Sequence, residues 1–204
     1  MKVLLINGSP RKQGNTFRAL SEIADQLHKL DIDSEIIQLG TKPVRGCIAC
    51  CKCAENGNGR CVFDDDLCNR VTETMRSCDA LIVGTPVYYG QPNGSVLALM
   101  QRMFYSAGEA FKGKPAAGVA VCRRGGATAA LQTLNMPFQI LHMPIVTSQY
   151  WNIVYGRAEG EAALDAEGMQ TMRSLALNMA RILRATANQS VPTYEPRQPM
   201  HFIR

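Results

Sequence analysis

Short apolar runs alternate along this chain with longer stretches in which apolar residues recur at every third or fourth position. The runs predict buried strands, because a strand covered on both faces has little place for polar side chains. These strands are expected at residues 2–7, 34–39, 80–84, 115–122 and 143–147. The periodic stretches predict helices, expected at residues 17–30, 67–75, 95–105, 128–134 and 159–187.

Strands that alternate with helices indicate an α/β fold, a doubly wound five-stranded parallel sheet with helices on both faces. We expect one domain over residues 1–204, with residues 40–66 as an insertion. Ligands of such sheets bind beyond the carboxyl ends of the strands. Three loops meet there in the predicted fold: residues 8–16, 86–91 and 122–126.

The first of these loops joins a strand to a helix and resembles a phosphate site. A helix N-terminus offers free N–H groups to an anion. Further donors are expected from Ser9, Arg11, Asn15 and Thr16. Five residues separate Gly8 from Gly14, and Asn15 stands where a Walker A lysine would be, so a nucleoside triphosphate is disfavoured. The G-x-G-x-x-G dinucleotide pattern is absent too, which leaves a single phosphate, as on FMN, or an ordinary turn.

The other two loops suit a flat ring beside that phosphate. The second loop offers Tyr88, Tyr89 and backbone amides, and the third offers Arg123 and Arg124 before two glycines. Reduced flavin carries negative charge near N1, so we expect one of the arginines to favour the reduced form. The alternative is that both arginines are solvated surface residues.

Composition narrows the function classes. The chain has 46% hydrophobic and 19% charged residues and a net charge of +5, and aromatic residues make up only 6%. Its basic residues are spread out, so nucleic-acid binding is disfavoured. We expect neither a signal peptide nor a membrane span, since the first apolar run stops at Asn7-Gly8. This pattern favours a cytoplasmic protein with no membrane partner.

Residues 40–66, here called the cysteine loop, follow no helical or strand period. Such a long irregular connection is usually functional or disordered. The spacing Cys47-x2-Cys50-x2-Cys53-x7-Cys61 is similar to the cysteine run of ferredoxins and would suit a [4Fe-4S] cluster. A structural zinc site or free thiols remain alternatives. Cys51 is a spare thiol, and Cys68, Cys78 and Cys122 are expected in the core.

Several motifs together resemble the NADPH-dependent FMN reductase family of flavodoxin-like proteins. They are Gly8-Ser-Pro-Arg11, Gly14-Asn-Thr16, Thr85-Pro-Val-Tyr-Tyr-Gly90, residues 165–173 and the ending Phe202-Ile-Arg204. The resemblance implies bound FMN, a homodimer or homotetramer, and reduction of flavins, quinones or azo and nitro compounds by NAD(P)H.

Carried onto this sequence, the resemblance assigns the FMN contacts. The phosphate would lie on Ser9, Arg11, Asn15 and Thr16, and the ring on Pro86, Val87, Tyr88, Tyr89 and Gly90. Arg123, Arg124, Gly125 and Gly126 complete the expected cofactor site. The pair Arg123-Arg124 departs from the usual Ser/Gly-rich loop of the family.

The cysteine spacing is similar to that of the iron-sulfur flavoproteins, a branch of the same family. In that case Cys47, Cys50, Cys53 and Cys61 would hold a cluster that exchanges electrons with FMN. The first expectation is an FMN-dependent NAD(P)H oxidoreductase with a small molecule or a protein as electron acceptor, and the cluster-fed electron carrier is the alternative. A non-enzymatic redox or ligand sensor is a third alternative. Flavin N5 accepts hydride directly, so no catalytic side chain is assigned.

Overall fold

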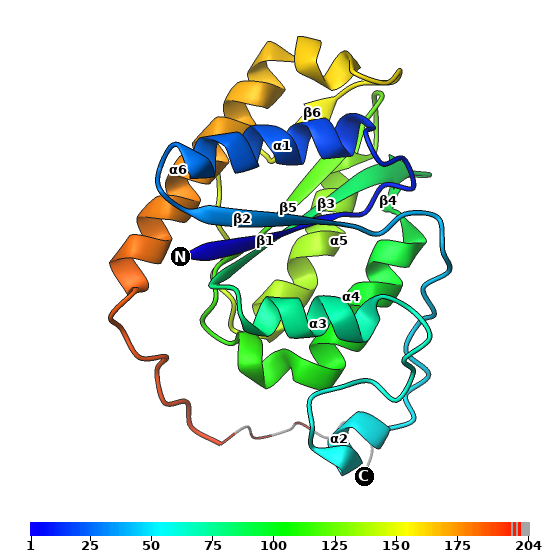
Figure 1. The fold of residues 1–204 in the computed structure, drawn as a ribbon, viewed down its shortest axis with the longest axis vertical. Helices are drawn as coiled ribbons and strands as arrows, with labels where there is room; N and C mark the ends of the chain where they lie inside the picture. Colours follow the sequence, from blue (N-terminus) through cyan, green and yellow to red (C-terminus); the bar gives the residue numbers. More distant parts are fainter. Residues whose placement is uncertain (197, 199, 201–204) are drawn as a thin grey trace.

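The computed structural model describes residues 1–196, 198 and 200 of the chain (Figure 1). Residues 190–196 contain no helix or strand, as expected for the tail after residue 192. The family-like ending Phe202–Arg204 lies outside the described residues, and so does His201.

Five parallel strands form the sheet, in the order β2-β1-β3-β5-β6. They are β1 (Lys2–Asn7), β2 (Asp33–Gln38), β3 (Ala80–Tyr88), β5 (Ala116–Cys122) and β6 (Ile153–Tyr155). A short strand, β4 (Gln91–Pro92), pairs antiparallel with the end of β3. The expected doubly wound α/β fold is therefore confirmed, with β4 as an addition.

Helices cover both faces of the sheet (Figure 1). Side chains alternate along β1, so Val3 and Leu5 pack in one core with α1 and α6, while Leu4 and Ile6 pack in the other with α3 and α4. The helices are α1 (Asn15–His28), α2 (Lys52–Asn56), α3 (Cys68–Arg76), α4 (Gly94–Ala107), α5 (Ala127–Ile140) and α6 (Ala166–Thr186). Single 3-10 turns occupy Gly108–Phe111 and Glu161–Leu164.

The predicted fifth strand was misplaced. Residues 143–147 make only an isolated parallel bridge, from Ile145 to Ala116, and the fifth strand is β6. Pro144 has no N–H to give to a ladder, which limits pairing there. Helix α5 also continues to Ile140, past Pro137, whereas the pattern predicts an end near residue 134.

The strand order reverses between β1 and β3, which defines a topological switch point. Ligands of open α/β sheets bind in the crevice that this reversal leaves at the carboxyl ends of the strands. The loops after β1, β3 and β5 all begin at this edge. The cysteine loop leaves the same edge from β2 and runs to α2, beside α4 (Figure 1).

Candidate functional site

Three loops at the switch point are joined by direct contacts. The Gly8 N–H donates to the Gly84 carbonyl at 2.8 Å, and Asn93 Nδ2 donates to the Gly8 carbonyl at 2.8 Å. On the other side, a Cβ added to Gly126 would lie only 2.6 Å from Gly90 Cα. Glycine is required there because the backbones of the second and third loops touch. The loops therefore form one continuous rim.

Helix α1 begins in this rim without a side-chain cap. Its N-cap is Gly14, and no described group accepts a hydrogen bond from the N–H groups of Asn15, Thr16 or Phe17. Helix α4 differs, because the Asn93 side chain caps it at the N–H of Ser95. Open N–H groups and the positive end of the helix dipole suit a phosphate oxygen. The arrangement at α1 thus fits the phosphate of FMN.

The predicted phosphate residues take different positions in the first loop. Ser9 is buried, and its Oγ accepts from the Arg11 N–H at 3.1 Å, which shapes the turn. Thr16 is buried in the first turn of α1, and Arg11 is exposed. The Asn15 side chain donates to the Ala158 carbonyl at 2.8 Å and accepts from the Ala162 N–H at 3.1 Å. It ties residues 156–162 to the loop.

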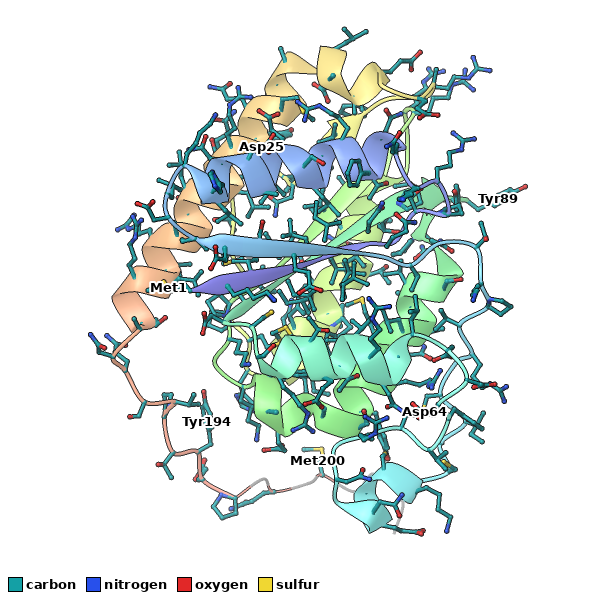
Figure 2. All side chains as sticks on the ribbon, in the orientation of Figure 1. Met1, Asp25, Asp64, Tyr89, Tyr194 and Met200 are labelled. Atoms are coloured by element: carbon teal, nitrogen blue, oxygen red, sulfur yellow. The ribbon has the colours of Figure 1, made fainter. Side chains whose placement is uncertain are left out.

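The residues predicted to bind the ring lie at the end of β3 and on the tight hairpin between β3 and β4. Tyr89 and Gly90 both have positive φ, 50° and 77°, as the two central residues of a type I′ turn require. A tyrosine is costly in that conformation, and such strain collects at functional sites. Tyr89 points outward from the rim (Figure 2). Arg123, Arg124 and Gly125 are exposed on the facing loop.

A second site lies in the cysteine loop. Cys47, Cys50, Cys51, Cys53 and Cys61 line one cavity together with Phe63, Arg102 and Tyr105. All eight cysteines are free thiols. The three cysteines expected in the core, Cys68, Cys78 and Cys122, are buried, and burial raises the pKa of the Cys68 thiol to about 11. The exposed or half-buried thiols are therefore those of the loop.

The backbone of the loop turns sharply around Cys50. Ala49 and Cys51 have φ of 52° and 57°, the left-handed region that costs non-glycine residues energy. These turns bring Cys47, Cys50 and Cys53 to one cavity although only two residues separate each pair. The Ala49 N–H also donates to Cys47 Sγ at 3.4 Å. The strain is typical of a binding loop.

One residue of this site was missed in the sequence analysis. Arg102, the only charged residue of α4, is buried, and its Nε donates to Cys61 Sγ at 3.2 Å. It pairs with buried Asp66, and these hydrogen bonds raise the pKa of Arg102 although burial acts to lower it. The sequence did offer one signal, because Arg102 is the one charged residue of an otherwise uncharged helix. The residues that Arg102 contacts, however, are distant from it in sequence.

Two negative findings apply to the described residues. In that part of the chain, no three His, Cys, Asp or Glu side chains lie close enough together to hold a metal ion. Nor does any described helix have the length and apolar character that crossing a membrane requires.

Comparison with known proteins identifies the family of the chain and its relatives. The sequence profile of NADPH-dependent FMN reductases matches residues 1–158. An iron-sulfur flavoprotein of Methanocaldococcus jannaschii is 32% identical over 192 residues, covering 90% of this chain and 98% of the relative. Another iron-sulfur flavoprotein, from Archaeoglobus fulgidus, is 31% identical over 202 residues, covering 92% of this chain and 98% of the relative.

A solved structure shares the fold at low identity. An archaeal flavodoxin aligns with a TM-score of 0.61 at 13% identity, covering 90% of this chain and 99% of its own. That likeness supports the flavodoxin-like architecture. The chain therefore belongs to the NADPH-dependent FMN reductase family, and its cysteine loop is similar to that of the iron-sulfur flavoproteins.

Proposed function

We propose that this protein is an FMN-dependent oxidoreductase in which a [4Fe-4S] cluster on Cys47, Cys50, Cys53 and Cys61 exchanges electrons with the flavin. The observation that carries the proposal is that these four free cysteines line one cavity. The motif spacing and the iron-sulfur flavoprotein relatives support it further. When bound, FMN can exchange one or two electrons and the cluster exchanges one.

The first loop would hold FMN by its phosphate. The open N–H groups at the start of α1 would bind the phosphate oxygens, helped by Ser9, Arg11 and Thr16. Asn15 would act chiefly by fastening residues 156–162 beside them. Pro86, Val87, Tyr88, Tyr89 and Gly90 would line the ring, with Arg123, Arg124, Gly125 and Gly126 on the opposite loop.

The cysteine motif favours a cluster over zinc. One Cys-x2-Cys-x2-Cys run and a later fourth cysteine match the ligand spacing of an iron-sulfur cluster. Structural zinc sites more often use two separated Cys-x2-Cys pairs, which this loop does not have. The iron-sulfur flavoprotein relatives support the same choice.

Serine substitutions test the ligand set. Each of C47S, C50S, C53S and C61S should lower the iron content of anaerobically purified protein well below four per chain, while FMN remains. C51S is the matched control, because Cys51 lines the same cavity but lies outside the proposed ligand set, and it should keep full iron. Iron retained in all four variants, or lost equally in C51S, would contradict the assignment.

The family name and the open rim favour a second candidate for the electron source. Tyr88 and Tyr89 are exposed at the site, which leaves a face where a nicotinamide could stack. NAD(P)H would then reduce FMN directly, and the electrons would pass to a flavin, a quinone, an azo or nitro compound, or a protein acceptor. Anaerobic mixing with NADPH or NADH decides this, since rapid bleaching of the flavin requires direct hydride transfer.

Assembly and compartment are also proposals. An exposed flavin rim is commonly covered by a partner chain, so we propose a homodimer or homotetramer. Light scattering that gives a monomer with intact flavin would contradict this. Eight free thiols suit a reducing compartment such as the cytoplasm.

A further inference from the structure

We propose that Arg102 is a positioning residue for the cluster, directing an N–H onto the Cys61 sulfur and raising the potential at which the cluster takes up an electron. The proposal rests on the proposed cluster function. It goes beyond the four ligands to a residue of α4, outside the cysteine loop, that nothing in the spacing of the motif indicates.

The guanidinium is held in one orientation by contacts on all three nitrogens. Nε donates to Cys61 Sγ at 3.2 Å, and Nη2 donates to the Phe63 carbonyl at 2.9 Å. Nη1 donates to the Arg45 carbonyl at 3.2 Å and to the Asp66 carboxylate. The side chain of Arg102 is 1% exposed and that of Asp66 is 6% exposed. Because all three nitrogens of the planar guanidinium are hydrogen-bonded, its Nε stays directed at the Cys61 sulfur.

The sulfur end of this contact is fixed as well. Asn69 is buried, and its Oδ1 accepts from the Cys61 N–H at 2.8 Å. Its Nδ2 donates to the Cys61 carbonyl at 2.9 Å. Cys61 is therefore bound on both sides of its backbone while Arg102 contacts its side chain. Of the four proposed ligands, Cys61 has the most complete support from the folded domain.

The direction of the effect follows from electrostatics. A one-electron reduction adds one negative charge to the cluster, with no bond formed or broken at Arg102. A buried positive charge and an N–H donor at a cluster sulfur stabilise that charge, and hydrogen bonds to the sulfurs are known to set cluster potentials. Asp66 offsets part of the charge, but it contacts Nη1, so the positive Nε edge still faces Cys61.

A purely structural role is the competing explanation, since Arg102 also ties the cysteine loop to α4. Two variants separate the roles. R102Q removes the charge but leaves Asp66 buried without its partner, which is costly. The double variant R102Q/D66N leaves no charge buried. R45Q is the matched control: Arg45 belongs to the cysteine loop and carries equal charge, but its side chain pairs with exposed Asp65 rather than a sulfur.

The test is an anaerobic redox titration of iron-loaded protein. The low-temperature EPR signal of the reduced cluster measures how much of the cluster is reduced at each potential. At a fixed potential, the ratio of reduced to oxidised cluster should fall about tenfold in R102Q and R102Q/D66N, which is ~59 mV for one electron. R102K should recover part of the shift, because it restores the charge without the fork. R45Q should stay near the wild-type value.

Three results would overturn the inference. Unchanged potentials in variants that keep four irons per chain would overturn the role of Arg102 and leave the cluster function standing. Loss of iron from all three Arg102 variants would show an anchor of the loop and not a residue that sets the potential. A wild-type protein that contains no iron would overturn the cluster function together with this inference.

Discussion

Asn93 Nδ2 donates to the Gly8 carbonyl at 2.8 Å, while Oδ1 of the same side chain accepts from the Ser95 N–H at 3.2 Å. One residue thus caps α4 and holds the proposed phosphate loop against the loop proposed to bind the ring. The two contacts use different atoms of the amide. They can therefore be removed separately.

Substitutions at Asn93 should separate its effect on the stability of α4 from its effect on FMN binding. N93S keeps an N-cap oxygen but loses the donor to Gly8, so FMN binding should weaken by about 1 kcal/mol, roughly fivefold, with little change in stability. N93A loses both contacts and should also lower the free energy of unfolding by about 1 kcal/mol. Flavin fluorescence titration and urea unfolding measure the two effects. Equal FMN affinity in N93S and wild type would contradict the role of the loop contact.

Arg123 and Arg124 should influence the flavin potential. Removing a guanidinium near N1 disfavours the reduced flavin, so R123A or R124A should lower the two-electron midpoint potential. Both residues are exposed, so the fall should be only of order 10–20 mV. R181A, on the exposed face of α6, is the control and should show no change. If neither variant lowers the potential, these arginines are ordinary solvated residues.

Glu22 should make stability depend on pH. It forms ion pairs with Arg18 of α1 and Arg173 of α6, both at 2.6 Å. Burial acts to raise the pKa of Glu22, but the hydrogen bonds from Arg173 and Arg18 prevail and lower it. A lowered carboxyl pKa adds stability above the unfolded value of about 4.3, and that stability is lost as the pH falls through the folded pKa.

The difference between the free energies of unfolding of E22Q and wild type measures this contribution. Because the arginines are partly exposed, the difference at pH 7 should be only about 1 kcal/mol. It should shrink as the pH falls through 4 and below. Urea unfolding of both proteins, prepared alike, at pH 7 and near pH 3 gives the comparison. A difference that stays the same at both pH values would show that charge is not its source.

Asn69 should matter for the cysteine loop. N69A would leave the Cys61 N–H and carbonyl without partners, at a cost of about 1–3 kcal/mol. The variant should lose iron faster than wild type when a chelator is added. N178A, which removes an exposed hydrogen bond to the Thr147 carbonyl, is the control and should behave as wild type. Identical iron release in N69A would show that Cys61 needs no such support.

Local patterns were enough to predict most of the fold. The apolar run at β1, the glycine loop after it and the periodic positions of α1 all agree with the structure. The fifth strand was wrong because β6 has only three residues, and its edge position depends on pairing with β5. Such pairing is a tertiary property that a short apolar run does not reveal.

The end of helix α5 also could not be predicted from local sequence alone. A proline normally ends a helix, at a cost of about 3 kcal/mol in its interior. Helix α5 nevertheless continues past Pro137, and Phe138 in the next position is fully buried, with its ring centroid 5.9 Å from that of Phe104. The contact spans 34 residues of sequence, so the spacing of α5 alone could not predict it.

The residues of the candidate sites also fall into two groups, those that local motifs predict and those that only tertiary packing brings together. The cysteine spacing and the glycine loops are local motifs, so their residues could be named from the sequence. Arg102 could not, because its partners Asp66 and Cys61 lie 36 and 41 residues away. Only the packing of α4 against the cysteine loop brings them together.

We propose above that one chain binds both FMN and a [4Fe-4S] cluster. The most direct measurement is an absorbance spectrum of anaerobically purified protein, combined with iron, zinc and FMN analysis. We expect flavin bands over broad cluster absorbance, with about four irons and one FMN per chain. A yellow protein without iron, or one that holds zinc instead, would contradict it.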